Sequence, residues 1–299
     1  MGRPTAIVLG AAAGGGFPQW NCRCEVCRLA WAGDKRAKAR GQSSVALSAD
    51  GEQWVLLNAS PDLRAQLQAT PALHPRGAPR GSPIAAIILT GAEVDQTAGL
   101  LHLRERGIFA LFGTAATLAA VAANPMFDVL AADVVTRRAC GLGEAFAPAR
   151  GIEAELFAVP GKVPLYLEDE NPALEAETAA NVGIDLVAGG KRLIYIPGAA
   201  AMTPALMRRL AGADVLLFDG TLFDDNEMIS SNTGTKTGRR MGHMPIDGGS
   251  LPALAELPGR RIYIHINNTN PILIDGSPQR RKVEAAGFEV AEDGMEIVL

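Results

Sequence analysis

This 299-residue sequence has neither a basic surplus nor many aromatic residues. It contains 28 Lys and Arg against 32 Asp and Glu, a formal net charge of −4, which argues against binding of nucleic acid through a broad basic face. Aromatic residues make up 5% of the chain, so few rings are available to stack single-stranded bases. We therefore expect no nucleic-acid partner, although these totals do not exclude a local basic patch.

Long hydrophobic runs are also scarce. The uncharged stretch 108–127 has the length of a membrane span, but it contains Asn124 and Pro125 and much of its bulk is alanine. It predicts a short strand and then a buried helix that is capped by Thr114 and ends at Asn124-Pro125. The first residues lead into the strand-length run Ala6–Leu9 without the pattern of a secretory signal. We expect a cytoplasmic protein with no membrane insertion.

The chain is 48% hydrophobic, enough to form a full core, and strand signals alternate with helix signals along it. The predicted strands are Ala6–Leu9, Ser44–Leu47, Trp54–Leu57, Ile84–Leu89, Phe109–Phe112, Glu155–Val159, Leu165–Leu167, Gly183–Val187, Arg192–Ile196, Val215–Phe218, Arg261–Ile264, Glu289–Val290 and Glu296–Val298. Further predicted helices are Pro61–Gln68, Thr203–Leu210 and Ser277–Ala286. Without a linker or a repeat, this order predicts one α/β domain over 1–299, with two mixed sheets face to face and helices outside.

Three cysteines, Cys22, Cys24 and Cys27, lie within six residues in a loop that follows the first strand. This spacing is typical of a structural Zn²⁺ site, because a tight loop presents three thiolates to one tetrahedral centre. A disulfide is the competing interpretation, but it strands one thiol unless that thiol reaches Cys140. An ordinary loop, with neither metal nor disulfide, is the third interpretation. A zinc site needs a fourth ligand from elsewhere, whereas Cys140 alone indicates a small buried hydrophobe.

Only four histidines are present, and two of them stand where functional groups gather. His265 ends the predicted strand Arg261–Ile264 and opens a run with three Asn in five residues. His243 ends a loop punctuated by glycines. His74 and His102 are expected to be solvated or simply packed.

Two carboxylates have a similar placement. Asp219 ends a buried apolar strand, where its charge needs a cation or hydrogen bonds. Asp95 comes shortly after another strand, with Glu93 two residues before it. Each carboxylate alone is compatible with a helix cap or a turn. Together with the two histidines, they favour a metal site.

The segment Thr90–Leu100 resembles the T-H-x-H-x-D-H-x-x-G-L loop of the metallo-β-lactamase superfamily. The segment keeps part of that pattern: Thr90, Asp95, Gly99 and Leu100. Three of its residues stand where the superfamily has histidines: Gly91, Glu93 and Gln96. Lys162 likewise replaces the histidine of the P-G-H turn. Asp219 matches the bridging aspartate and His265 the last histidine, while His243 resembles the extra histidine of the transfer-RNA-processing and phosphodiesterase branches.

The resemblance implies one metal position where the superfamily has two. The first position has Gly91, Glu93 and Lys162, and an ammonium there opposes a dication. The second position keeps enough ligands for one ion: Asp95, Asp219 and His265, with Glu93, Gln96 or His243 nearby. Two histidines and one carboxylate with open positions are the usual ligands of non-haem Fe(II), whereas hydrolytic members of the superfamily normally hold zinc.

Three sequence segments closely resemble those of the coenzyme pyrroloquinoline quinone (PQQ) biosynthesis protein B family: GGGFPQWNC at 14–22, VPGKVPLY at 159–166 and HINNTNP at 265–271. The likeness runs from about Ile7 to Leu299. It implies a metallo-β-lactamase-like αββα sandwich and a zinc held by the three cysteines of the loop near 14–28. It further implies hydroxylation, with iron and oxygen, of the tyrosine ring in a cross-linked Glu-Tyr unit cut from a precursor peptide.

Other functions remain open. An older assignment of the family is a carrier that moves PQQ or a precursor toward the periplasm, and a zinc-dependent hydrolase is the third interpretation. In the hydroxylase interpretation, Lys162 or the pair Arg239 and Arg240 binds the carboxylates of the small acidic substrate. Asn268 is the expected fourth zinc ligand, because related phosphodiesterases place a histidine at the matching position. Other PQQ-pathway proteins are candidate partners.

Overall fold

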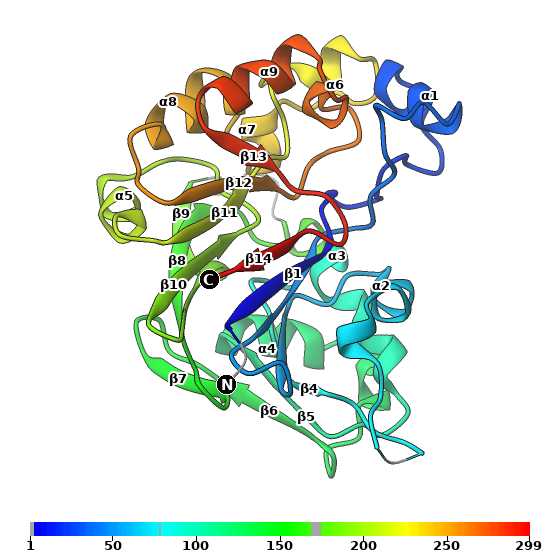
Figure 1. The fold of residues 1–299 in the computed structure, drawn as a ribbon, viewed down its shortest axis with the longest axis vertical. Helices are drawn as coiled ribbons and strands as arrows, with labels where there is room; N and C mark the ends of the chain where they lie inside the picture. Colours follow the sequence, from blue (N-terminus) through cyan, green and yellow to red (C-terminus); the bar gives the residue numbers. More distant parts are fainter. Residues whose placement is uncertain (1–2, 78, 169–174) are drawn as a thin grey trace.

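The computed structural model describes residues 3–77, 79–168 and 175–299 (Figure 1). One sheet consists of β1 (Thr5–Gly10), β2 (Ser44–Ser48), β3 (Trp54–Leu57), β4 (Ile84–Ile88), β5 (Phe109–Gly113), β6 (Val135–Ala139) and β14 (Glu296–Val298). The other consists of β7 (Ala145–Ala149), β8 (Ile152–Gly161), β9 (Ala176–Ala188), β10 (Lys191–Ile196), β11 (Val215–Asp219), β12 (Arg260–Ile264) and β13 (Phe288–Val290). The helices are α1 (Glu25–Trp31), α2 (Leu63–Ala69), α3 (Val94–Thr97), α4 (Ala115–Ala122), α5 (Pro204–Leu210), α6 (Glu227–Ser230), α7 (Gly238–Met241), α8 (Leu251–Leu254) and α9 (Pro278–Ala285).

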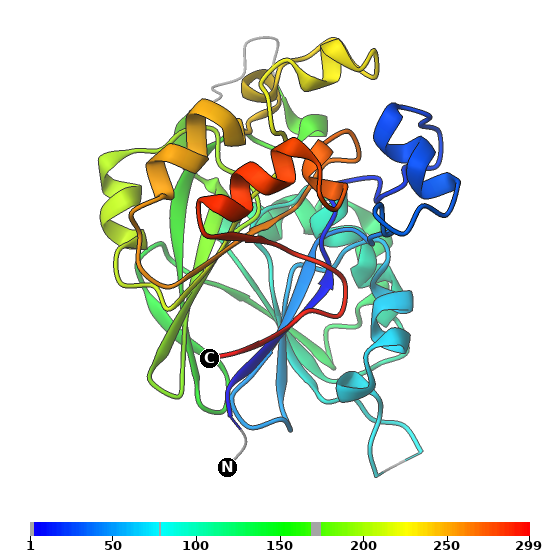
Figure 2. The ribbon, with the colours of Figure 1, turned by 45° about the horizontal axis from the view of Figure 1, so that its top comes forward.

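Both sheets are mixed and have seven strands. The orders are β14-β1-β2-β3-β4-β5-β6 and β13-β12-β11-β10-β9-β8-β7. Pairing is parallel from β3 to β6 in the first sheet and from β10 to β13 in the second. The two sheets face each other with helices on their outer sides (Figures 1 and 2), which confirms the predicted αββα fold.

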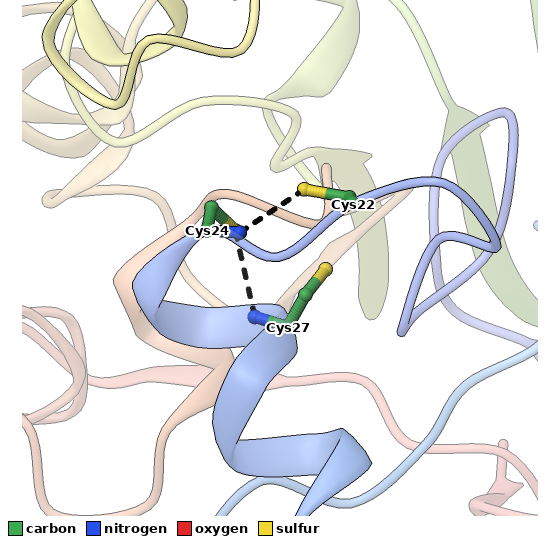
Figure 3. Close-up of side chains that lie close together, drawn as sticks. All are labelled: Cys22, Cys24 and Cys27. Carbon is green, nitrogen blue, oxygen red and sulfur yellow. Dashed lines mark hydrogen bonds between the residues drawn. The ribbon is translucent and has the colours of Figure 1, made fainter.

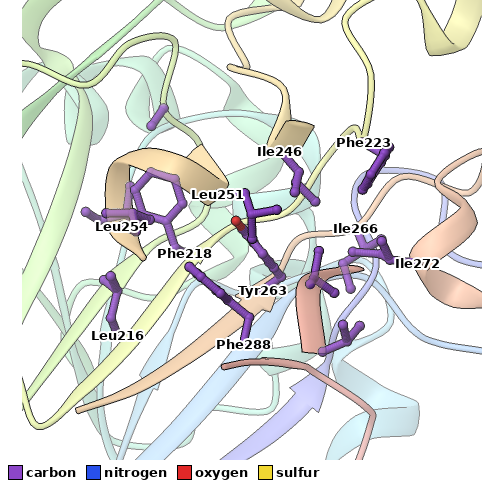
Figure 4. Close-up of a cluster of buried hydrophobic side chains, with 14 of the residues drawn as sticks. Leu216, Phe218, Phe223, Ile246, Leu251, Leu254, Tyr263, Ile266, Ile272 and Phe288 are labelled. Carbon is purple, nitrogen blue, oxygen red and sulfur yellow. The ribbon is translucent and has the colours of Figure 1, made fainter. Parts of the chain in front are cut away.

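Three clusters of buried apolar side chains correspond to these layers. The cluster between the sheets takes residues from both of them, among others Val8, Leu57 and Ile88 from the first and Leu217 and Ile262 from the second. A second cluster packs α2 and α4 on the outer face of the first sheet. The third packs α5, α8 and α9 on the outer face of the second sheet (Figure 4). Each fully buried large apolar side chain stabilises the fold by roughly 1.5–3 kcal/mol.

The uncharged stretch 108–127 forms β5 and then α4. The Thr114 hydroxyl accepts a hydrogen bond from the Thr117 N–H, so Thr114 is the helix cap that the sequence predicts. Within the part of the chain that the structure describes, every helix is too short or too polar to cross a bilayer.

Some secondary structure differs from the prediction. The predicted strand Leu165–Leu167 is a short 3-10 helix, because its side chains are 50–60% exposed and have no sheet to pair with. The elements missed include β6, β7 and α1, as well as the four-residue helices α3, α6, α7 and α8. Strand β6 lies at a sheet edge, and its arginines interrupt the apolar alternation that marks a strand. Helix α1 is capped by Cys24, the residue before it. The Cys24 thiol accepts a hydrogen bond from the Cys27 N–H, where most helices have a side-chain oxygen.

Candidate active site

Asp219 is the last residue of β11, and its carboxylate is fully buried. Oδ1 accepts hydrogen bonds from the Thr221 hydroxyl at 2.6 Å and from the Thr221 N–H at 3.0 Å. Oδ2 accepts one from the Ala199 N–H at 2.9 Å and lies 2.7 Å from His243 Nδ1. These partners replace the water that the carboxylate loses on burial.

His265 directly follows β12, and its φ of 58° lies in the left-handed region. Its Nε2 lies 2.8 Å from Asp95 Oδ2, and its Nδ1 lies 2.9 Å from Thr221 Oγ1. The ring stacks on His243, with 5.4 Å between the ring centroids. Asp95 is in α3, which follows β4 of the other sheet. The four polar residues that the sequence singles out near strand and loop ends therefore meet at one place between the two sheets.

Burial and charge oppose each other in this cluster. Burial alone would raise the pKa of Asp95 and of Asp219, but the two histidines and further hydrogen bonds together outweigh it, so both pKa values are lowered. Burial alone would lower the pKa of His265, but the hydrogen bond and charge of Asp95, together with the charges of Asp219 and Glu93, outweigh it and raise that pKa. Both carboxylates are therefore ionised near neutral pH, which is the form that binds a cation.

The donor atoms fit a single metal ion. One ligand atom each of Asp219, His243 and His265 lies within 4.8 Å of the other two. Two imidazoles and a carboxylate suit Zn²⁺ or Fe(II), and Asp95 adds a second carboxylate beside His265. The glycine loop closes over this cluster, since a Cβ atom on Gly14 would lie 3.6 Å from Asp95 Oδ2.

Lys162 and Glu93 lie together, as expected for the altered first metal position. Lys162 follows β8, and its Nζ lies 3.5 Å from Glu93 Oε1 and 2.5 Å from Glu168 Oε1. Burial raises the pKa of Glu93, against the opposing charge of Lys162. Gln96 turns away toward the backbone, because its Oε1 accepts a hydrogen bond from the Glu93 N–H at 3.1 Å. The ammonium of Lys162 therefore faces the same cavity as His243 and His265.

A cavity of about 800 Å³ opens on the cluster, large enough for a small peptide-derived molecule. Its walls include Asp95, Lys162, Tyr166, His243 and His265.

The two arginines proposed to bind substrate separate in the structure. Neither lines the cavity, but Arg240 pairs at 3.3 Å with Glu168, which does, whereas Arg239 is exposed. His74 and His102, expected to be solvated or simply packed, are exposed in the structure.

The three clustered cysteines lie at the start of α1 (Figure 3). The Cys24 N–H donates to Cys22 Sγ and the Cys27 N–H donates to Cys24 Sγ, each at 3.4 Å. The three sulfur atoms lie within 4.8 Å of one another, and all four cysteines of the chain are free thiols. A hydrogen bond from Cys24 lowers the pKa of Cys27. Sulfur atoms so arranged fit one tetrahedral ion. Cys140 is apart from them and packs against the core between the sheets, as expected.

Asn268 lies against this cysteine cluster. Its side-chain Nδ2 is 3.1 Å from Cys22 Sγ and 3.2 Å from Cys27 Sγ, and its backbone carbonyl oxygen is 3.7 Å from Cys27 Sγ. The position predicted for the fourth ligand is therefore next to the thiols.

Sequence reasoning did not single out Thr221, Tyr166 or Glu168, which the structure brings to the site. Thr221 stands two residues after Asp219, and a hydroxyl so close to a strand-end carboxylate was an available signal. Tyr166 donates a hydrogen bond to the Ala92 carbonyl at 2.7 Å. Tyr166 and Glu168 reach the cavity only through the path of an irregular loop, which no local pattern indicates.

Comparisons with known proteins agree with this geometry. Residues 53–266 match the family model described as the beta-lactamase superfamily domain. Coenzyme PQQ synthesis protein B of Methylobacterium nodulans is 58% identical over 297 residues, covering 98% of this chain and 99% of that protein. The protein of the same name from Rhizobium meliloti is 54% identical over 296 residues, covering 98% of this chain and 97% of that protein.

Solved structures give the same relationship. The crystal structure of Zn²⁺-bound PqqB from Methylobacterium extorquens has a TM-score of 0.97 and 55% identity, with 99% of this chain and 100% of that chain covered. A diphosphatase of the PhnP family has a TM-score of 0.70 at 21% identity, covering 99% and 97%, which shows the shared fold. The chain therefore belongs to the coenzyme PQQ synthesis protein B family of the beta-lactamase superfamily.

Proposed function

We propose that this protein acts in PQQ biosynthesis and hydroxylates the tyrosine ring of a cross-linked Glu-Tyr precursor, using one Fe(II) and dioxygen. The observation that carries this proposal is the ammonium of Lys162, which pairs with Glu93 beside the cluster of Asp219, His243 and His265. A dinuclear hydrolase stabilises the attacking and leaving oxygens with two cations. A fixed ammonium in the place of one of them favours chemistry that needs a single metal ion.

The reaction balances with an external reductant. One oxygen atom of dioxygen enters the ring and replaces a hydrogen, while the other leaves as water, so two electrons and two protons come from a small-molecule donor. Iron, when bound, supplies the redox chemistry of this step.

The residues of the chain orient the site and the substrate. Thr221 donates its hydroxyl proton to Asp219 and accepts from His265 Nδ1, which holds both side chains in position. Lys162 supplies a charged donor for the carboxylates of the substrate. Tyr166, which lines the cavity and is half-exposed, presents its ring beside the space for the substrate ring.

We further propose that Cys22, Cys24, Cys27 and Asn268 hold a structural zinc. The spacing of the thiols and the contact of Asn268 with two of them support this ligand set. Rotation of the Asn268 amide by half a turn exchanges its nitrogen for its oxygen, which is the atom that coordinates metals.

A turnover experiment tests the hydroxylase. The protein is loaded with Fe(II) without oxygen and given the cross-linked Glu-Tyr compound, a reductant and then oxygen, and the products are read by mass spectrometry. We expect gain of one oxygen atom that depends on iron. Full turnover without any bound transition metal would discard the proposal.

The His265→Asn variant separates chemistry from folding. Asn accepts the left-handed backbone at this position more readily than Ala does, so the substitution removes the ligand with little strain. We expect loss of hydroxylation with a melting temperature close to that of the wild type. A carrier of PQQ or its precursor would instead keep its ligand affinity in this variant and lose it in Lys162→Ala.

A further inference from the structure

We propose that Lys162 and Arg240 form a binding site for one carboxylate of the substrate, and that Glu168 occupies this site until the substrate displaces it. The inference rests on the proposed function only for the identity of the substrate. The site itself is defined by three charged side chains: Lys162 and Glu168, which line the cavity, and Arg240, which pairs with Glu168.

One carboxylate bridges two cations in this arrangement. Glu168 Oε1 accepts from Lys162 Nζ at 2.5 Å, and Oε2 accepts from Arg240 Nη1 and Nη2 at 3.3 and 3.4 Å. The Glu168 side chain is only 7% exposed and that of Lys162 13%. Burial alone would raise the pKa of Glu168, but the two cations outweigh it and lower that pKa. A substrate carboxylate in the same place would use the same two charge-assisted contacts.

The two cations stand on regular structure next to the metal cluster. Lys162 directly follows β8, and Arg240 is in α7. The stem of Lys162 lies against Gly242, whose φ is +85°, and a Cβ atom there would be 3.1 Å from Lys162 Cγ. Since Gly242 precedes His243, the carboxylate site is adjacent to the proposed ligands.

Glu168, in contrast, belongs to a segment with little apolar anchoring. Besides the Glu168 contacts, the Leu165 N–H donates to Glu93 Oε1 at 3.1 Å and the Tyr166 hydroxyl donates to Ala92 O at 2.7 Å. The side chains of Leu165, Tyr166 and Leu167 are 60%, 51% and 50% exposed. Moving this segment therefore uncovers little apolar surface, and a ligand that replaces the ion pairs can displace it.

The exchange selects for charge. A carboxylate on the ligand restores the pairing that Lys162 and Arg240 lose when Glu168 leaves, whereas an amide of the same shape does not. An acidic ligand therefore competes with Glu168 for the two cations, whereas a neutral ligand leaves Glu168 in place, so that removal of Glu168 changes the affinity for acidic ligands most.

Binding of two matched peptides tests the inference without turnover. N-acetyl-Glu-Tyr-amide carries one carboxylate, and N-acetyl-Gln-Tyr-amide replaces it with an amide. Dissociation constants are measured by calorimetry for the wild type, Glu168→Ala and Glu168→Gln. We expect Glu168→Ala to bind the acidic peptide about tenfold more tightly than the wild type does. Its affinity for the neutral peptide should stay within about twofold of the wild-type value. The affinity of Glu168→Gln for the acidic peptide should lie between those of the wild type and Glu168→Ala.

Two further variants serve as controls. Glu144→Ala removes an exposed carboxylate outside the cavity and should bind like the wild type, which accounts for net charge. Adding Lys162→Met to Glu168→Ala should abolish the preference for the acidic peptide. If Glu168→Ala binds the acidic peptide no more tightly than the wild type, or binds neither peptide, Glu168 only braces the two cations and the inference is wrong. If the wild type prefers the acidic peptide as expected but does not hydroxylate the Glu-Tyr compound, the proposed function alone would be contradicted.

Discussion

Thr221 joins three of the polar residues in the candidate active site through one hydroxyl group. Its oxygen lies 2.6 Å from Asp219 Oδ1, 3.1 Å from His243 Nδ1 and 2.9 Å from His265 Nδ1. A hydroxyl has one proton, and Asp219 can only accept, so the Thr221 oxygen accepts from the ring N–H of His265. A neutral His265 with its proton on Nδ1 would then offer Nε2 to a metal in place of its present contact with Asp95.

We therefore expect Thr221→Val to weaken Fe(II) binding about 10–100-fold. The substitution keeps the shape of the side chain but removes the hydroxyl, so the ring tautomer of His265 is no longer fixed. Anaerobic competition with a coloured chelator measures the affinity. Thr221→Ser retains the hydroxyl and should restore most of it. Equal affinities for the Val and Ser variants would show that the hydroxyl does not position the histidine.

Glu227 is the second informative single residue. It is buried at the start of α6, and its carboxylate accepts hydrogen bonds from the Phe223 N–H and the Thr269 hydroxyl. Burial raises its pKa to about 7 from the ordinary 4.5. Between these two values the folded state binds more protons than the unfolded state, so stability falls as the pH rises through this window, by roughly 2–3 kcal/mol.

Glu227→Gln should remove this part of the pH dependence. The amide oxygen can accept from the Phe223 N–H while the amide nitrogen faces the Thr269 oxygen. Free energies of unfolding in urea at pH 5 and pH 8 are compared for the two proteins. We expect the variant to lose less stability than the wild type between these values. The same loss in both proteins would contradict the assigned origin.

At the scale of elements, the sequence predicted the regular parts of the fold and missed the ones set by context. Strands such as β10 and β11 are continuous apolar runs, so their composition alone identifies them. Strand β6 contains two arginines, and Leu165–Leu167 is apolar but exposed. Their conformation is decided by whether a neighbouring strand is there to pair with. Strand β6 has such a neighbour, whereas Leu165–Leu167 does not.

Helix α1 is an element that the proposed zinc would stabilise directly. It has seven residues, too few to persist alone in water, and its cap is the Cys24 thiol. Cys24→Ser should therefore lower both the zinc content and the yield of folded protein, because metal binding contributes to folding free energy. Cys140→Ser, which changes a cysteine outside the cluster, should leave both unchanged. Unaltered zinc content in Cys24→Ser, measured by atomic emission, would contradict the proposed site.

At the scale of the whole molecule, the candidate site depends on contacts between distant parts of the chain. Placement after strands was enough to select Asp219, His265 and Asp95, and the family resemblance supplied Lys162 as their neighbour. The sequence could not place Glu168, because its position depends on contacts with Lys162 and Arg240 that no local pattern indicates. Local patterns define strands, whereas the cavity is formed by loops that meet only after the sheets have packed.

One segment connects the two proposed metal centres. Asn268, which contacts the cysteine cluster, comes three residues after His265. Between them, the Asn267 N–H donates to Thr221 O at 3.0 Å and the Ile266 N–H donates to Ala11 O at 2.9 Å. The Asn270 amide also donates to Gly220 O at 2.9 Å. The loop that carries the thiols and the turn that carries Asp219 are thus both fastened to the residues around His265.

Loss of zinc should therefore weaken iron binding, although the two centres share no ligand. We expect Cys24→Ser to raise the dissociation constant for Fe(II) about fivefold or more. The reason is that the segment 265–268, which positions His265, loses its attachment through Asn268 to the zinc-bound cysteine cluster. Thermodynamic linkage requires the converse, so Fe(II) should raise the affinity of the wild-type protein for zinc, measured by equilibrium competition with a chelator. His265→Asn is the control for the second measurement, since Fe(II) should not protect its zinc. Wild-type iron affinity in folded Cys24→Ser would mean that the two centres are energetically independent.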